Sequence, residues 1–156
     1  FHHEGRLSVS DCSELTQSLI STGFPYDRTR VDSLAQRTKL FLTHCADVRR
    51  KGACSLDLCQ VACGVVDAYF ESVEPWDLAA GVVIAREAGA VRSHPSITAL
   101  NTDNSGDSND GSDRDQATIT EPEAAQFFLE GDHLLIATPK IHTQLHDLLS
   151  QIKEIA

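Results

Sequence analysis

A carboxylate at the start of a very apolar helix is the first feature of this sequence that could do chemistry. Asp77 follows Pro75 and Trp76 and precedes the small, apolar residues 78–88. Pro75 stops any helix arriving from upstream, and Asp77 lies where a carboxylate accepts the free amides of a first helical turn. Gly89 ends the helix. Asp77 is therefore either a helix cap or a ligand presented at the positive end of a helix dipole.

A second candidate site begins at Gly52. Residues 47–51 are typical of a short basic strand, Gly52 of a turn, and the residues after it of a helix. This junction leaves backbone amides pointing out of the helix start, where an anion or a hydroxyl group can dock. Ala53 and Cys54 belong to that start. By itself the pattern favours an ordinary strand-to-helix turn with exposed arginines.

Glu71 is the third candidate, at the end of a strand. Residues 65–71 alternate between apolar and polar positions, which predicts a strand that delivers Glu71 toward the start of the Asp77 helix. A charged residue at the end of a strand is usually only solvated. Its predicted direction toward the start of the Asp77 helix makes Glu71 a candidate binding residue.

These segments together resemble the inositol monophosphatase family of metal-dependent sugar phosphatases. The matching segments are Trp-Asp-Leu-Ala-Ala-Gly at 76–81, Arg-Glu-Ala-Gly at 86–89, Arg-Arg-Lys-Gly-Ala-Cys-Ser-Leu-Asp-Leu-Cys at 49–59, Asp-Ala-Tyr at 67–69, Arg-Leu-Ser-Val-Ser at 6–10 and Thr-Gly-Phe-Pro at 22–25. The resemblance covers nearly the whole chain. It implies an α/β fold, the C-terminal half of a layered α-β-α-β-α sugar-phosphatase fold with a mixed sheet flanked by helices.

The resemblance also implies a reaction and a set of site residues. Asp77 would bind Mg²⁺ and orient a sugar hydroxyl, Glu71 would accept hydrogen bonds from substrate hydroxyls, and Gly52, Ala53 and Cys54 would contact the sugar. The reaction would be Mg²⁺-dependent hydrolysis of inositol monophosphate to inositol and phosphate. Ala53 replaces the hydroxyl residue usual in the family and Cys54 replaces the usual alanine. The backbone contacts stay possible, whereas the side-chain contact, and with it the exact sugar, is left open.

The other metal ligands that the resemblance implies are missing. In the family they come from an upstream Gly-Glu motif and an Asp-Pro-x-Asp-Gly-Thr motif, and this sequence contains neither a Gly-Glu nor an Asp-Pro pair. One carboxylate cannot build an octahedral magnesium site alone. We therefore assign no catalytic residue within the chain and expect it to be inactive in isolation. The chain also lacks Met and begins at Phe1, so we expect it to be part of a longer enzyme.

Three alternatives remain open. A phosphatase of the same fold acting on histidinol phosphate or on 3′-phosphoadenosine nucleotides would keep Trp76 and Asp77, although the nucleotide enzymes tend to have His where this chain has Leu78. A catalytically dead, truncated homologue would serve as a binding or dimerisation partner. In a purely structural module, Asp77 would be a helix cap and nothing more.

Composition restricts the partners. The net charge of −10 argues against nucleic acid or an anionic membrane surface, and no apolar run is long enough for a membrane span. We expect a small sugar or inositol phosphate as ligand, and a homodimer is left open. The cysteines have no zinc-type spacing, which predicts reduced thiols in a cytoplasmic protein. They are Cys12, Cys45, Cys54, Cys59 and Cys63.

The remaining pattern predicts one domain, 1–156, with a polar interruption. Residues 5–10, 18–24 and 133–138 are typical of strands, and residues 30–46 and 141–155 of amphipathic helices. Residues 95–120, rich in Asp, Ser, Asn and Gly, predict a disordered acidic insertion. The helix at 30–46 is expected to face the sheet with Val31, Leu34, Ala35, Phe41, Leu42 and Cys45. His142 and His146 lie one turn apart and are expected to be exposed.

Overall fold

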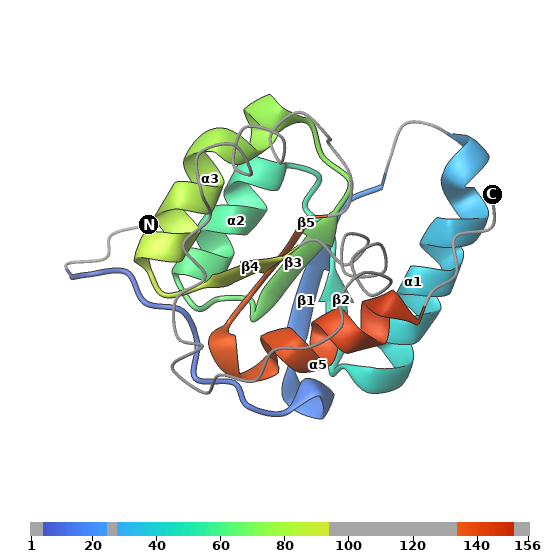
Figure 1. The fold of residues 1–156 in the computed structure, drawn as a ribbon, viewed down its shortest axis with the longest axis horizontal. Coiled ribbons are helices and arrows are strands. Elements are labelled where there is room, and N and C mark those ends of the chain that lie inside the picture. The colour runs from blue at the N-terminus through green and yellow to red at the C-terminus, as the bar shows by residue number, and fades with distance from the viewer. Residues whose placement is uncertain (1–4, 25–27, 94–133, 152–156) are drawn as a thin grey trace, which may run out of the picture.

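The chain folds as a mixed five-stranded sheet with helices on both faces (Figure 1). The computed structural model describes residues 5–24, 28–93 and 134–151. The elements in chain order are η1 (Leu15–Gln17), β1 (Leu19–Thr22), η2 (Arg28–Arg30), α1 (Val31–His44), β2 (Asp47–Arg49), α2 (Cys54–Ala62), β3 (Ala68–Glu71), α3 (Pro75–Glu87), β4 (Val91–Ser93), β5 (Leu134–Ala137) and α5 (Pro139–Ser150). The predicted α/β class with a mixed, helix-flanked sheet is confirmed. The predicted insertion at 95–120 lies outside the described residues.

Three parallel strands form one side of the sheet. The strand order is β2-β1-β3-β5-β4, in which β1 is parallel to both β2 and β3, and β5 is antiparallel to β3 and β4. Ile20 is in register with Val48 on one side and with Ala68 on the other. The carboxyl ends of β1, β2 and β3 therefore meet at one edge, which is where α/β sheets usually bind ligands.

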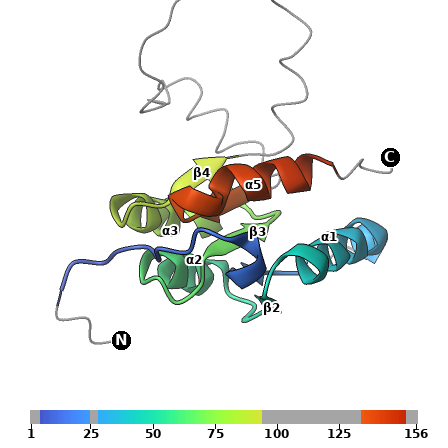
Figure 2. The ribbon, with the colours of Figure 1, turned by 90° about the horizontal axis from the view of Figure 1, so that it is seen from below.

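The two faces of the sheet have separate cores. Tyr69, Leu134 and Ile136 face α2 and α3, whereas the alternate residues Phe70 and Leu135 face α1 and α5. This period-2 alternation is the direct consequence of strand geometry. The helices α2 and α3 lie side by side, as Figures 1 and 2 show from two directions. Their close packing requires Gly81, because a Cβ there would lie 2.6 Å from Leu58 Cδ1.

Helix α1 packs on the sheet with a different face from the predicted one. Phe41 and Cys45 are buried as expected, but Val31 and Leu42 are 46% and 61% exposed. Arg37 is buried in their place, with its guanidinium 5.4 Å from the centre of the Phe70 ring. A long basic side chain can bury its stem and stack its head on an aromatic ring, which apolar periodicity does not detect.

Two other sequence-based expectations were wrong. Residues 5–10 do not form a strand, and Val9 instead donates a single backbone hydrogen bond to the Ala88 carbonyl at 3.0 Å. His142 and His146 are half-buried on α5, with stacked rings whose centroids are 6.3 Å apart. His142 Nε2 is 2.9 Å from Ser93 Oγ, and burial lowers the pKa of His142 to about 4. His142 therefore contributes to the packing of α5 on β4, and His146 stacks against it.

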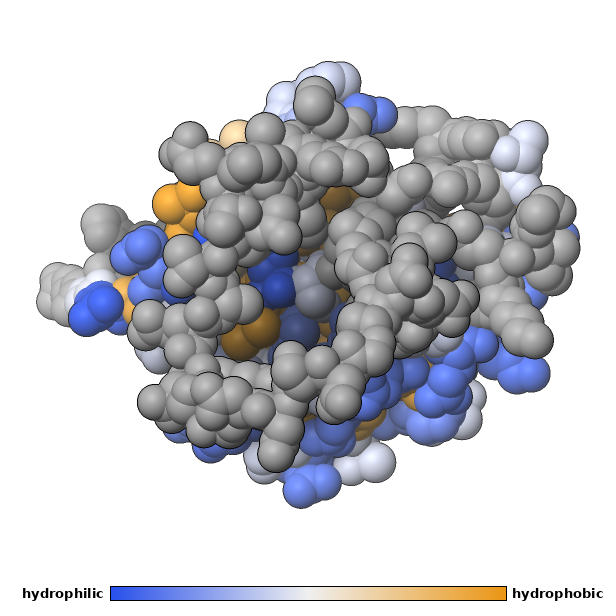
Figure 3. Space-filling model, in the orientation of Figure 1, coloured by the Kyte–Doolittle hydropathy of each residue, from blue (hydrophilic) through white to orange (hydrophobic). Residues whose placement is uncertain are grey.

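Helix α3 keeps an apolar outer surface in this chain. Its sequence predicts a helix covered on several sides, yet Trp76, Val83 and Ile84 are 76%, 58% and 38% exposed. We call these three residues, with the exposed Ala79 and Ala80 between them, the outer face of α3. Figure 3 shows apolar side chains at the surface on the side where Figure 1 places this helix. Among the described helices, none is long and apolar enough to cross a membrane.

Candidate active site

The candidate residues come from four segments that meet at the carboxyl edge of the parallel strands. Glu71 ends β3, Gly52 and Ala53 form the turn between β2 and α2, and Cys54 begins α2. Asp77 lies in the first turn of α3. The Cys54 thiol is 3.7 Å from the Asp77 carbonyl oxygen, which joins the starts of the two helices. The structure thus brings all five predicted positions to one region, although their roles stay predictions.

Asp77 is not the cap of its helix. Glu74 occupies the N-cap position, and no side chain caps the first turn by a hydrogen bond. Within the described residues, the Asp77 carboxylate is exposed and makes no hydrogen bond or ion pair. The sequence-based alternative of a purely structural cap therefore has no support in the geometry. What remains is a carboxylate at the positive end of a helix dipole, open to a cation or a hydroxyl group.

Glu71 is held inside the site. The Tyr69 hydroxyl donates a hydrogen bond to Glu71 Oε2, and the two residues share a face of β3. The carboxylate rests over Gly23, where an added Cβ would be 1.9 Å from both carboxylate oxygens. Burial raises the pKa of Glu71, opposed by the Tyr69 hydrogen bond and the charge of Arg50, and assisted by the charges of Asp57 and Asp77.

The start of α2 offers backbone groups and a protonated thiol. Gly52 has φ +81°, the left-handed conformation that favours glycine, so it makes the turn out of β2. Ala53 is the N-cap residue of α2 and has no side chain that could cap it. Burial raises the pKa of the Cys54 thiol to about 11. Cys54 is therefore a packed thiol and a weak donor, not a nucleophile.

Two supporting interactions escaped the sequence analysis. Asp57 is 1% exposed, and its Oδ1 accepts a hydrogen bond from the buried Ser21 hydroxyl at 2.5 Å. The Arg50 guanidinium carbon lies 4.7 Å from the centre of the Phe24 ring. Phe24 directly follows Gly23, against which the Glu71 carboxylate lies. Ser21 and Asp57 are far apart in sequence, so only the parallel pairing of β1 and the packing of α2 reveal the contact.

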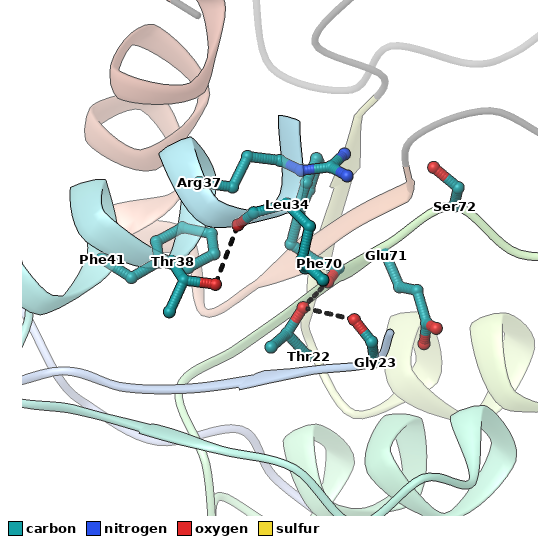
Figure 4. Close-up of a pocket in the computed structure, with 9 residues that line it drawn as sticks. All are labelled: Thr22, Gly23, Leu34, Arg37, Thr38, Phe41, Phe70, Glu71 and Ser72. Atoms are coloured by element: carbon teal, nitrogen blue, oxygen red, sulfur yellow. Dashed lines mark hydrogen bonds between the residues drawn. The ribbon is translucent and has the colours of Figure 1, made fainter. Parts of the chain in front are cut away.

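A small pocket adjoins Glu71 on the α1 side of the sheet (Figure 4). In Figure 4 the Glu71 side chain extends toward Gly23, away from Arg37 and Thr38 of α1. Thr22 Oγ1 donates a hydrogen bond to the Phe70 carbonyl at 2.6 Å and ties the two strand ends together. The Glu71 carboxylate thus points away from α1. The other candidate residues lie at the starts of α2 and α3, so the candidate site is on that side of the sheet.

These features define the class: an α/β protein with a mixed sheet, whose acidic side chains and helix starts gather at the carboxyl ends of the parallel strands. This is the edge at which α/β sheets usually bind ligands. The inositol monophosphatase family model matches residues 1–154. The chain belongs to the inositol monophosphatase family.

Individual relatives agree with this membership. A SuhB protein from Neisseria meningitidis serogroup B is 37% identical over 150 residues, which is 95% of this chain and 47% of the relative. An inositol-1-monophosphatase from Synechocystis is 45% identical over 87 residues, 54% of this chain and 30% of the relative. The solved inositol monophosphatase from Anabaena superposes with a TM-score of 0.69 at 32% identity, covering 96% of this chain and 49% of that one. The Neisseria and Anabaena proteins match nearly all of this chain, and the chain spans about half of their length.

Proposed function

We propose that this chain provides the substrate-binding end and one metal ligand for Mg²⁺-dependent hydrolysis of inositol monophosphate to inositol and phosphate. The observation that carries this proposal is the Asp77 carboxylate, which is exposed at the start of α3 and makes no hydrogen bond or ion pair with the described residues. Family membership supplies the reaction class, phosphomonoester hydrolysis. A carboxylate kept free of structural partners at a helix start is suited to binding a cation and a substrate hydroxyl.

The donor chemistry of Asp77 fits magnesium as a single ligand. Carboxylate oxygens are what Mg²⁺ takes from proteins, and in this reaction class the bound ion polarises the phosphate and activates water. Within the described residues there is no group of three His, Cys, Asp or Glu side chains that could hold a metal. We therefore propose that the chain does not turn over substrate in isolation, because the remaining ligands must come from outside these residues.

Each remaining residue has a binding role in this proposal. Glu71 accepts a hydrogen bond from a ring hydroxyl of the substrate, and Asp77 both ligates the cation and orients a second hydroxyl. The turn at Gly52 and Ala53 presents backbone amides at the start of α2, where they can meet oxygen atoms of the ligand. Cys54 contacts the ligand but does not react with it, because its thiol keeps its proton at neutral pH.

The test is to measure binding and turnover with the same chain. Isothermal titration with inositol 1-phosphate in the presence of Mg²⁺ is expected to show weak binding, and Asp77→Asn is expected to weaken it by about tenfold, the loss of one charge-assisted contact. The melting temperature should fall by at most a few degrees, because the carboxylate has no partner among the described residues and only its interaction with the helix dipole is lost. A phosphate-release assay is expected to give no activity above background.

The matched control is Glu87→Gln, which removes an exposed carboxylate at the far end of the same helix. It should leave binding unchanged. An equal loss in both variants would show that only net charge matters and would refute the role of Asp77. Clear Mg²⁺-dependent phosphate release by the wild-type chain would refute the need for outside ligands. Titrations with histidinol phosphate and 3′-phosphoadenosine 5′-phosphate would decide between the alternative substrates.

A second candidate function is a binding role without turnover. Several relatives are named Nus factor SuhB, among them a Pasteurella multocida protein 46% identical over 89 residues. The observation in favour is the outer face of α3, whose apolar side chains are exposed in this chain. Under this candidate we propose that the face mediates self-association into a homodimer.

Trp76 makes this second candidate easy to test, because it is the only tryptophan in the sequence. If the outer face of α3 is a dimer contact, tryptophan emission should shift to the blue as concentration rises over about a hundredfold range, and light scattering should show a dimer. Trp76→Ser should remain monomeric, whereas Leu42→Ser on α1 should associate like the wild type. A wild-type chain that stays monomeric throughout would exclude this dimer.

A further inference from the structure

Glu71 is unusually constrained for a glutamate at the end of a strand. One of its carboxylate oxygens, Oε2, accepts the hydrogen bond of the Tyr69 hydroxyl. For the other, Oε1, no partner exists among the described residues. Both oxygens lie against Gly23, so the carboxylate occupies the space that any other residue at position 23 would fill with its Cβ. A glutamate side chain has several rotamers, and these contacts select one of them.

Tyr69 is suited to hold such a contact permanently. It is fully buried, and its ring is packed in the core between β3, α2 and α3. Burial is the main cause that raises the pKa of Tyr69, and the neighbouring Cys54 and Glu71 raise it further. The hydroxyl therefore keeps its proton and acts as a donor. A rigid, buried ring with a polar tip can fix a partner with little loss of conformational entropy.

We propose that Tyr69 and Gly23 are positioning residues, which hold the Glu71 carboxylate in one orientation and leave Oε1 as the acceptor for a hydroxyl group of a polyol phosphate. The binding partner in this statement rests on the proposed function, whereas the orientation of Glu71 does not. Because Asp77 also has a free carboxylate, the two acceptors together favour a ligand that carries several hydroxyl donors. A preset acceptor loses less entropy when the ligand binds than a mobile one.

The orientation can be measured without any ligand. In a chain labelled with ¹³C at the glutamate carboxyls, the Glu71 signal is identified by its absence in Glu71→Gln and titrated by NMR. Tyr69→Phe keeps the ring and removes the hydroxyl, so the Glu71 midpoint should move to higher pH, because a hydrogen bond to the ionised form is lost. Gly23→Ala should move the midpoint to lower pH, because the new methyl group pushes the carboxylate toward water.

The control is Ser10→Ala, which removes a hydroxyl bonded to Asp67 at 2.5 Å, at the opposite end of β3. It should leave the Glu71 midpoint unchanged, whereas a general loss of stability would affect all variants alike. The wild-type chain should also show a nuclear Overhauser contact between the Glu71 side chain and the Gly23 Hα atoms, and this contact should weaken in Tyr69→Phe. A folded Tyr69→Phe with an unchanged midpoint, or a wild-type chain without the contact, would overturn the proposal.

This result is independent of the proposed function. If the titration behaves as expected and inositol 1-phosphate does not bind, the positioning of Glu71 stands and the ligand assignment fails. If inositol 1-phosphate binds and the Glu71 midpoint does not respond to Tyr69→Phe, the ligand assignment stands and the positioning role fails.

Discussion

Replacing Gly81 with valine is expected to lower the free energy of unfolding by about 3 kcal/mol, because it overpacks the contact between α2 and α3. The first added carbon would already lie 2.6 Å from Leu58 Cδ1 and 2.9 Å from Leu58 Cβ. Leu58 is fully buried, so its side chain cannot swing out into solvent to make room. Chemical denaturation followed by circular dichroism would measure the loss.

The control for this prediction lies one residue away on the same helix. Ala80 is exposed, so Ala80→Val should cost only about 0.5 kcal/mol, the difference in helix propensity. Adding Leu58→Ala to Gly81→Val should cost less than the sum of the two single changes, because the smaller side chain makes room for the valine. Equal losses in Gly81→Val and Ala80→Val would contradict the packing geometry.

Ser21→Ala is expected to cost about 2 kcal/mol, because it leaves the buried Asp57 carboxylate without its hydroxyl donor. The Ser21 hydroxyl and Asp57 Oδ1 are 2.5 Å apart, and both residues are buried between β1 and α2. Hydrogen bonds to a charged group contribute more than neutral ones, and a buried acceptor that loses its partner adds a desolvation penalty. Urea denaturation of the variant at neutral pH would give this value.

Ser18→Ala provides the matched comparison. Ser18 is also fully buried, but its hydroxyl donates to the neutral Leu15 carbonyl at 2.7 Å, so its loss should cost only about 1 kcal/mol. The Ser21→Ala and Asp57→Ala double variant should be more stable than the sum of the single losses predicts. If Ser21→Ala and Ser18→Ala proved equally mild, the Asp57 carboxylate would have to be solvated in solution.

Both interactions hold the frame of the candidate site. The Gly81 contact sets the distance between the helix starts that carry Cys54 and Asp77, and the Ser21 hydrogen bond fixes α2 against β1. We therefore expect Gly81→Val and Ser21→Ala to weaken binding of inositol 1-phosphate as well as stability. Neither residue is among the five proposed binding positions, so such a loss would come from misplacement of the binding groups.

Much of the fold was predictable from local signals. The proline at position 75, the glycine at 89 and the apolar run between them identified α3, and the alternation before Glu71 identified β3. Local signals failed where a single interaction outweighed the pattern. On α1, Arg37 is buried where the pattern predicted apolar residues. Residues 5–10 alternate between apolar and polar positions as a strand does, but they form no strand. Tertiary contacts override propensity in such places.

The sequence by itself determined which residues are candidates for chemistry, because Asp77, Glu71 and the turn at Gly52 each carry a local signature of residue type and spacing. It also determined the family through those motifs. Only the tertiary structure decided that Asp77 is not the N-cap of its helix and that the Glu71 carboxylate lies between the Tyr69 hydroxyl and Gly23. The physical reason is that parallel strand pairing and helix packing join residues distant in sequence, and no local pattern encodes the distance between their side chains.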